Sequence, residues 1–172
     1  MVEFLEDYFY RQNHLYNTLH SVSDKMCEDN GKNYIDFDNF PFFIKISSIA
    51  TTDTLLLNKD NNYIVFVEFK NLDKVQDFKK WFNRKRKQQI YLKAYESFLS
   101  LGELFNQGTH YDYSSYYNLD KRFILVYDGK DSRKRIQRHI QGKIKRFGFI
   151  FNDNVFTMRC SGFKKFLGET NL

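Results

Sequence analysis

Two short apolar segments of this chain carry charged residues where a buried strand normally carries none. Asp53 lies near the start of TDTLLLN, and Glu68 and Lys70 lie near the end of YIVFVEFKNL. Both segments are rich in strand-forming residues, and the NKDNN between them predicts a hairpin turn. Because successive strand residues face opposite sides, Glu68 and Lys70 share one face, and antiparallel pairing brings Asp53 within reach of both.

Two carboxylates held this close together repel each other unless a cation neutralises them. A hard divalent cation such as Mg²⁺ or Mn²⁺ does so with carboxylate, carbonyl and water ligands, and the backbone carbonyl of Phe69 offers a further oxygen. Such a cation lowers the pKa of its bound water and stabilises the charge that develops on a phosphorane. Lys70 would then contact the attacking water or the scissile phosphate. The pattern therefore predicts metal-dependent hydrolysis of phosphodiester bonds.

The rest of the chain predicts the elements that position these residues. We expect helices over residues 2–28, 74–105 and 132–147, and strands over residues 42–49, 52–58, 63–72 and 122–129. A loop is expected over residues 110–118, and two short strand-like pieces over residues 149–159. This order predicts a single domain over residues 1–172, of the α/β (α+β) class, with a mixed central sheet flanked by helices.

The same residues resemble the motif of the PD-(D/E)XK nuclease superfamily, which includes type II restriction enzymes, archaeal Holliday junction resolvases and RecB-like nuclease domains. The matching residues are Asp53 and the triplet Glu68-Phe69-Lys70, and the two acids are fifteen residues apart. The resemblance covers an αβββαβ core over residues 2–130 and implies a restriction endonuclease-like fold. It also implies that Asp53 and Glu68 bind Mg²⁺ or Mn²⁺ and that Lys70 is catalytic. The implied activity is that of an endo- or exonuclease acting on DNA, and the implied assembly is a homodimer.

The helix expected after this motif contributes a supporting residue. Tracing its inward face by threes and fours gives Trp81, Lys85, Gln88, Leu92, Tyr95 and Leu99. Some branches of the superfamily point a Gln or Lys of this helix at the metal or phosphate, so the resemblance implies a catalytic role for Gln88, with Gln89 the second choice. A bend near Asn83 that exposes both glutamines is the open alternative. By the same resemblance, Glu6 on the first helix is a candidate for an additional metal ligand.

The charge distribution favours a polyanionic partner. The net charge is +6; residues 1–40 hold eight acidic and three basic residues, and residues 41–172 hold 24 basic and 13 acidic ones. Nucleic acid is the commonest polyanion bound by such a surface, and we expect DNA rather than RNA. The expected nucleic-acid contacts come from two helices and comprise Lys85, Arg86, Lys87, Lys93, Arg135 and Arg138.

Neither a membrane partner nor an export signal is expected. The longest apolar runs, such as FILVY at 123–127, are far shorter than a membrane span, and the acidic MVEFLEDYFY does not resemble a signal peptide. Cys27 and Cys160 lie far apart without a CxxC pattern, which predicts no zinc site, no iron–sulfur cluster and no disulfide scaffold. A cytoplasmic location is therefore expected.

Two other functions remain open. A non-catalytic nucleic-acid-binding module that keeps the nuclease fold would bind DNA with steep salt dependence but would not cut it. An interaction protein would carry Glu68 and Lys70 as an ordinary ion pair on a solvated strand edge, a contact worth well under ~1 kcal/mol. Cleavage in the presence of Mn²⁺ and salt-sensitive DNA binding separate the three functions.

Overall fold

The structure is a computed structural model that describes residues 1–12, 15–40, 49–72, 75, 77–81, 83–106, 111–128, 148–151, 154–170 and 172. Six strands of these residues form one sheet in the order β1-β2-β3-β4-β5-β6. Their bounds are β1 Tyr16–Thr18, β2 Asn33–Asp36, β3 Thr54–Asn58, β4 Tyr63–Asn71, β5 Asp120–Asp128 and β6 Val155–Met158. Strands β1 to β4 pair antiparallel, whereas β4 pairs with β5 and β5 with β6 in parallel. The predicted mixed central sheet is confirmed.

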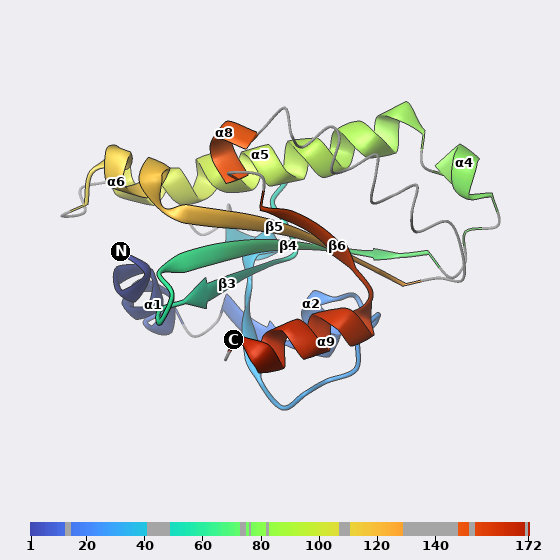
Figure 1. Cartoon of the computed structure of the whole chain (residues 1–172), viewed down its shortest axis with the longest axis horizontal. Helices are drawn as coiled ribbons and strands as arrows, with labels where there is room; N and C mark the ends of the chain where they lie inside the picture. Colours follow the sequence, from blue (N-terminus) through green and yellow to red (C-terminus); the bar gives the residue numbers. More distant parts are fainter. Residues whose placement is uncertain are drawn as a thin grey trace.

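Helices cover both faces of this sheet. Their bounds are α1 Val2–Tyr10, α2 Leu19–Val22, the 3-10 helix η2 Phe37–Asn39, α4 Phe78–Trp81, α5 Arg84–Asn106, α6 Tyr113–Asn118, α8 Gly148–Phe151 and α9 Cys160–Glu169. The long α5 runs along one face of the sheet, and α2 and α9 lie on the other (Figure 1). The core is divided accordingly into two apolar clusters, one shared with α1 and α5 and the other with α2 and α9.

The β3–β4 hairpin sets the register of the candidate site. Thr54 lies opposite Val67 in the antiparallel pair. Phe66 belongs to the cluster under α5, and Val67 belongs to the cluster under α9. By strand alternation Glu68 and Lys70 then lie on the α5 face, as the sequence predicts.

The crossover from β4 through α5 to β5 closes the centre of the sheet. β5 runs parallel to β4 along its full length, from Tyr63 opposite Asp120 to Asn71 opposite Asp128. A parallel pair needs a long connection, which α5 provides. Because both strands are covered on both faces, their sequences are nearly continuous apolar runs, and this is why they could be predicted.

The amino-terminal region differs from its prediction. The helix expected over residues 2–28 ends at Tyr10, and β1 and α2 follow it. The side chain of Thr18 accepts a hydrogen bond from the Ser21 amide and caps α2, so the chain changes direction there. β1 pairs with β2, with Tyr16 opposite Ile35. The helix prediction was therefore wrong for this segment. A three-residue strand that pairs with residues 33–35 leaves no periodic pattern of apolar residues in its own sequence by which it could be recognised.

Other predicted elements also need correction. The expected first strand, 42–49, falls almost wholly outside the described residues, and the strand that pairs with β3 is β2, which the sequence reading missed. The expected loop over 110–118 contains α6, because Asp112 caps a helix by accepting from the Ser115 amide at 2.8 Å. Of the two strand-like pieces expected over 149–159, the first includes part of α8 and only the second is a strand, β6.

The carboxyl-terminal part adds α9, a helix that the sequence reading did not predict. The predicted helix over 132–147 lies outside the described residues. Within the described ranges, no helix is both long enough and apolar enough to cross a membrane.

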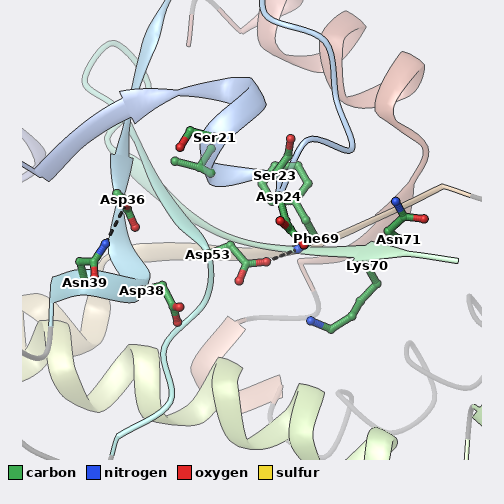
Figure 2. Close-up of a pocket in the computed structure, with 11 residues that line it drawn as sticks. Ser21, Ser23, Asp24, Asp36, Asp38, Asn39, Asp53, Phe69, Lys70 and Asn71 are labelled. Atoms are coloured by element: carbon green, nitrogen blue, oxygen red, sulfur yellow. Dashed lines mark hydrogen bonds between the residues drawn. The ribbon is translucent and has the colours of Figure 1, made fainter.

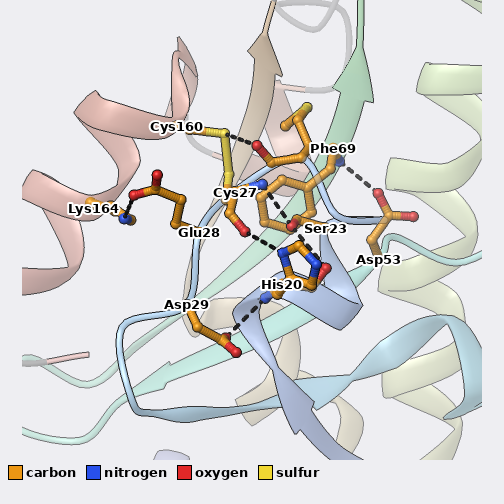
Figure 3. Close-up of a disulfide and its surroundings, with 10 residues drawn as sticks. His20, Ser23, Cys27, Glu28, Asp29, Asp53, Phe69, Cys160 and Lys164 are labelled. Atoms are coloured by element: carbon orange, nitrogen blue, oxygen red, sulfur yellow. Dashed lines mark hydrogen bonds and ion pairs between the residues drawn. A yellow bond between two sulfur atoms is a disulfide. The ribbon is translucent and has the colours of Figure 1, made fainter.

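Cys27 and Cys160 form a disulfide with their Cα atoms 5.5 Å apart, so the expectation of no disulfide was wrong (Figure 3). The bridge joins the segment after α2 to the first residue of α9 across 133 residues of chain. The amide of Cys27 donates to Ser23 Oγ at 3.0 Å, and its carbonyl oxygen lies 3.3 Å from His20 Nδ1. The sequence separation concealed the pairing because only the folded sheet brings the two ends together.

Candidate active site

Asp53, the residue before β3, is held between η2 and β4 by its own backbone and side chain. Its carbonyl oxygen accepts from the amide of Phe37 at 3.2 Å. Its Oδ2 accepts from the amide of Phe69 at 2.6 Å, an interaction drawn in Figure 2. The carboxylate is therefore held against the end of β4, next to the residues of the predicted triplet.

Glu68 is a fully buried carboxylate with lysine ammonium groups beside both of its oxygens. Lys70 Nζ donates to Glu68 Oε1, and Lys93 Nζ lies 3.2 Å from Glu68 Oε2. Lys93 Nζ also donates to Asp53 Oδ1 at 3.0 Å and lies 3.7 Å from Asp38 Oδ1. Thus the antiparallel pair brings Asp53, Glu68 and Lys70 together as expected, and α5 adds Lys93 between the two acids.

The electrostatics of this cluster shift the pKa of Glu68. Burial, reinforced by the negative charge of Asp53, raises the pKa of Glu68 to about 7, although Lys70 and Lys93 act in the opposite direction. Burial also lowers the pKa of Lys93, but the charges of Glu68, Asp53 and Asp38 outweigh it and raise that pKa above its ordinary value. The cluster is thus a set of coupled charges in a poorly solvated position.

Two cavities open onto this cluster. One has a volume of about 450 Å³ and is lined by residues of the α2 region and by Asp36, Asp38, Asp53 and Lys70. In Figure 2 the Lys70 side chain extends from β4 toward α5. The other cavity, about 330 Å³, is lined by Ala50, Glu68, Lys70, Trp81, Arg86, Gln89, Ile90, Leu92 and Lys93. Lys70 lines both cavities. The first is acidic because four aspartates line it, and the second is basic because Arg86 and Lys93 line it besides Lys70 and Glu68.

A divalent metal fits this site only with ligands besides side chains. In the described part of the chain, no group of three or more His, Cys, Asp and Glu side chains is arranged to hold a metal ion. Asp53 and Glu68 offer two carboxylates, and the buried Glu68 Oε2 faces the Lys93 ammonium at 3.2 Å without a well-directed hydrogen bond. Mg²⁺ commonly binds through one or two carboxylates and keeps several waters, so these hard oxygen ligands suit it.

The prediction for α5 placed the wrong face inward. The residues that α5 buries include Ile90, Ala94, Ser97, Phe98 and Leu101. By contrast, Leu92 on the predicted inward stripe is 50% exposed. α5 begins at Arg84 after a break, and Gln88 and Gln89 are both exposed, which matches the alternative of a bend near Asn83.

Gln89, rather than Gln88, lines the cavity beside Glu68. Its Oε1 accepts from Arg86 at 3.2 Å, so the two side chains lie together at the mouth of that cavity. Gln88 is exposed and does not line either of the two cavities. Of the two glutamines that the sequence offers for a supporting role, the second choice, Gln89, is therefore the one next to Glu68.

The other predicted residues are dispersed. Glu6 pairs with Lys59 at 3.6 Å instead of meeting the acid pair. Lys85 and Arg86 are exposed at the start of α5, and Lys87 is half-buried. Lys93 is engaged with the acids, whereas Arg135 and Arg138 lie outside the described residues.

Several residues that build the site were missed by the sequence reading. Ser97 accepts from the Thr52 amide at 2.7 Å, and Glu96 accepts from the Ala50 amide at 2.6 Å, so α5 anchors the segment that leads into Asp53. Ser97 also shares the buried face of α5 with Ala94, one residue after Lys93. The spacing of these small buried residues was the one signal that could have placed Lys93 close to the sheet.

Comparisons of the chain with protein-family models, with curated proteins and with solved structures find no match. An acid pair with an adjacent lysine, between an acidic and a basic cavity, suits a cation on one side and a phosphate on the other.

Proposed function

We propose that this chain is a divalent-metal-dependent nuclease that hydrolyses phosphodiester bonds, with DNA as its substrate. The observation that carries the proposal is the convergence of Asp53 and Glu68 at the end of the β3–β4 hairpin, with Lys70 on the Glu68 oxygen. The order of elements supports it: antiparallel β2, β3 and β4, then α5 and the parallel β5. This is the core that the resemblance to PD-(D/E)XK nucleases implies.

The chain's own residues have distinct roles in this proposal. Asp53 and Glu68 bind the cation, and the Phe69 amide holds the Asp53 carboxylate in place. When bound, Mg²⁺ or Mn²⁺ supplies an activated water and stabilises negative charge on the phosphate, and the backbone carbonyl of Phe69 is proposed as a further ligand. Lys70, which lines both cavities, contacts the water or the scissile phosphate.

The basic cavity is the proposed phosphate-binding side. Arg86 lines it together with Gln89, and Lys85 is exposed near them at the start of α5. Phosphate contacts of this kind position a nucleic acid without reading its sequence. Each Lys or Arg that neutralises a phosphate contributes about 0.9 to the slope of log affinity against log salt on duplex DNA.

The test is cleavage of labelled single-stranded, duplex and branched DNA in Mg²⁺ or Mn²⁺, compared between the native chain and Glu68→Ala and Lys70→Ala. Lys165→Ala is a matched control, because it removes one positive charge from an exposed position on α9. We expect the two site variants to lose cleavage while keeping DNA binding, and the control to keep both. Cleavage that survives both site variants would place the activity elsewhere.

A second function has one observation in its favour. Lys93 already neutralises Asp53 and Glu68 with a protein cation, at 3.0 and 3.2 Å. A non-catalytic nucleic-acid-binding module would retain this arrangement permanently. It predicts salt-sensitive DNA binding, no cleavage in Mn²⁺ and no affinity for the metal.

The homodimer and the cytoplasmic location stay predictions. Sedimentation of the purified chain tests the first. Thiol counting in freshly lysed cells tests the second. A cytoplasmic chain should have both cysteines reduced, since that compartment is reducing, whereas the bridge between Cys27 and Cys160 seen in the structure should persist in an oxidising compartment.

A further inference from the structure

The Lys93 ammonium lies between the carboxylates of Asp53 and Glu68, in the position that a cation bound by both would take. This ammonium lies 3.0 Å from Asp53 Oδ1 and 3.2 Å from Glu68 Oε2, and it reaches toward Asp38 Oδ1 at 3.7 Å. These three acids come from different parts of the chain: Asp38 from η2, Asp53 from the start of the hairpin and Glu68 from β4. Lys93 itself comes from a fourth element, α5.

Lys93 and the two acids that it bridges are largely shielded from solvent. The exposed fraction of the side chain is 22% for Lys93, 20% for Asp53 and 0% for Glu68. Two carboxylates with so little solvent need a positive partner, since an unpaired buried charge is strongly destabilising. Lys70 contacts one oxygen of Glu68, whereas Lys93 contacts both Glu68 and Asp53. Among the described residues Lys93 is therefore the ammonium that bridges the pair.

We propose that Lys93 is the resident counter-ion of the acid pair, and that a divalent cation binds only when its ammonium leaves the gap between Asp53 and Glu68. The inference rests on the proposed function, because it concerns the same metal-binding carboxylates. Lys93 is then a positioning residue that holds the two acids ready in the absence of metal.

The structure offers a place for the displaced side chain. Lys93 lines the cavity of about 330 Å³ that Lys70, Arg86 and Gln89 also line. A rotation of the flexible lysine side chain into this cavity would add a third ammonium or guanidinium group to the proposed phosphate-binding side. Metal binding and phosphate binding would therefore favour the same position of the Lys93 side chain, so that the binding of one would strengthen the binding of the other.

The first experiment compares Mn²⁺ binding by calorimetry at pH 8 in the native chain, Lys93→Met and Lys70→Met. Both variants remove one positive charge next to Glu68, but Lys93→Met alone removes the group between the acids. We expect Mn²⁺ affinity to rise at least about tenfold in Lys93→Met, because no ammonium has to be displaced, and to change much less in Lys70→Met. Without metal, Lys93→Met should unfold about 6 °C or more below the native chain, and Mn²⁺ should restore most of that loss.

The outcomes separate the two proposals. If the native chain and Lys93→Met bind Mn²⁺ equally well, the metal site stands and the counter-ion role of Lys93 is wrong. Equal gains in Lys93→Met and Lys70→Met would show a general charge effect and would also overturn it. If none of the three proteins binds Mn²⁺, the proposed nuclease function fails together with this inference.

A second measurement needs no variant and so does not depend on whether Lys93→Met folds. Amine acetylation of the native chain, read by mass spectrometry, reports how accessible each lysine is. We expect the acetylation of Lys93 to rise several-fold when saturating Mg²⁺ is added, while that of the exposed Lys165 stays constant. Unchanged acetylation of Lys93 under conditions where calorimetry shows bound Mg²⁺ would overturn the inference.

Discussion

Replacing Glu68 with Gln should change how the stability of this protein depends on pH. In the folded chain, burial and the charge of Asp53 raise the pKa of Glu68 from its ordinary 4.5 to about 7. Between these values the folded state keeps a proton that the unfolded chain has released. The free energy of unfolding therefore falls as the pH rises from about 4.5 to about 7, and this contribution is constant above that range.

The size of the effect follows from the same two pKa values. The difference between 4.5 and about 7 corresponds to about 3 kcal/mol, since one pKa unit is worth about 1.4 kcal/mol. Glu68 is fully buried, so solvent does not screen this contribution appreciably. Glu68→Gln resembles the protonated acid in shape and cannot titrate, and it should lack this fall.

Urea unfolding at several pH values between 4.5 and 8, followed by the fluorescence of Trp81 with a chelator present, measures both curves. The native chain should lose about 3 kcal/mol more than Glu68→Gln across this range. Parallel curves for the two proteins would contradict the raised pKa of Glu68, because they would mean that Glu68 titrates as it does in the unfolded chain.

Three further changes test the packing of the fold. Cys27→Ser should lower the free energy of unfolding by about 2–4 kcal/mol, and a reducing agent should lower the native chain to the same level; no effect of the reductant would contradict the bridge. Gly102→Ala should lower the free energy of unfolding by about 1–2 kcal/mol, because the added Cβ would lie 2.9 and 3.0 Å from tyrosine rings of α6. Gly168→Ala is the control: it has open space around it, and in the same urea assay it should raise the free energy of unfolding by up to ~1 kcal/mol. Lys121→Met should cost about 3 kcal/mol, because the buried ammonium donates to three backbone carbonyls at the end of α6, and an unchanged urea midpoint would disprove that role.

The centre of the fold could be predicted because its signals are local. The buried strands β3, β4 and β5 are apolar runs bounded by turn residues, and the hairpin register alone placed Asp53 next to Glu68. The short strands β1 and β2 are three and four residues long and are recognised only by their pairing in the sheet, β1 with β2 and β2 with β3. Their sequences carry no pattern long enough to predict a strand.

The missing parts of the site come from the packing of α5 on the sheet. The inward stripe was traced from Trp81, but α4 ends at that residue and α5 begins at Arg84, so the helical phase does not continue across the break. The true inward face includes Ala94 and Ser97, which a hydrophobic pattern does not mark. This error of phase favoured Gln88 over Gln89 and hid the contact of Lys93 with the acids.

The most direct test of the proposed metal site is the anomalous diffraction of crystals grown with Mn²⁺ at saturating concentration. We expect a peak between the carboxylates of Asp53 and Glu68, with the Lys93 side chain turned toward Arg86. A map without that peak, in which the Lys93 ammonium still joins the two carboxylates, would contradict it.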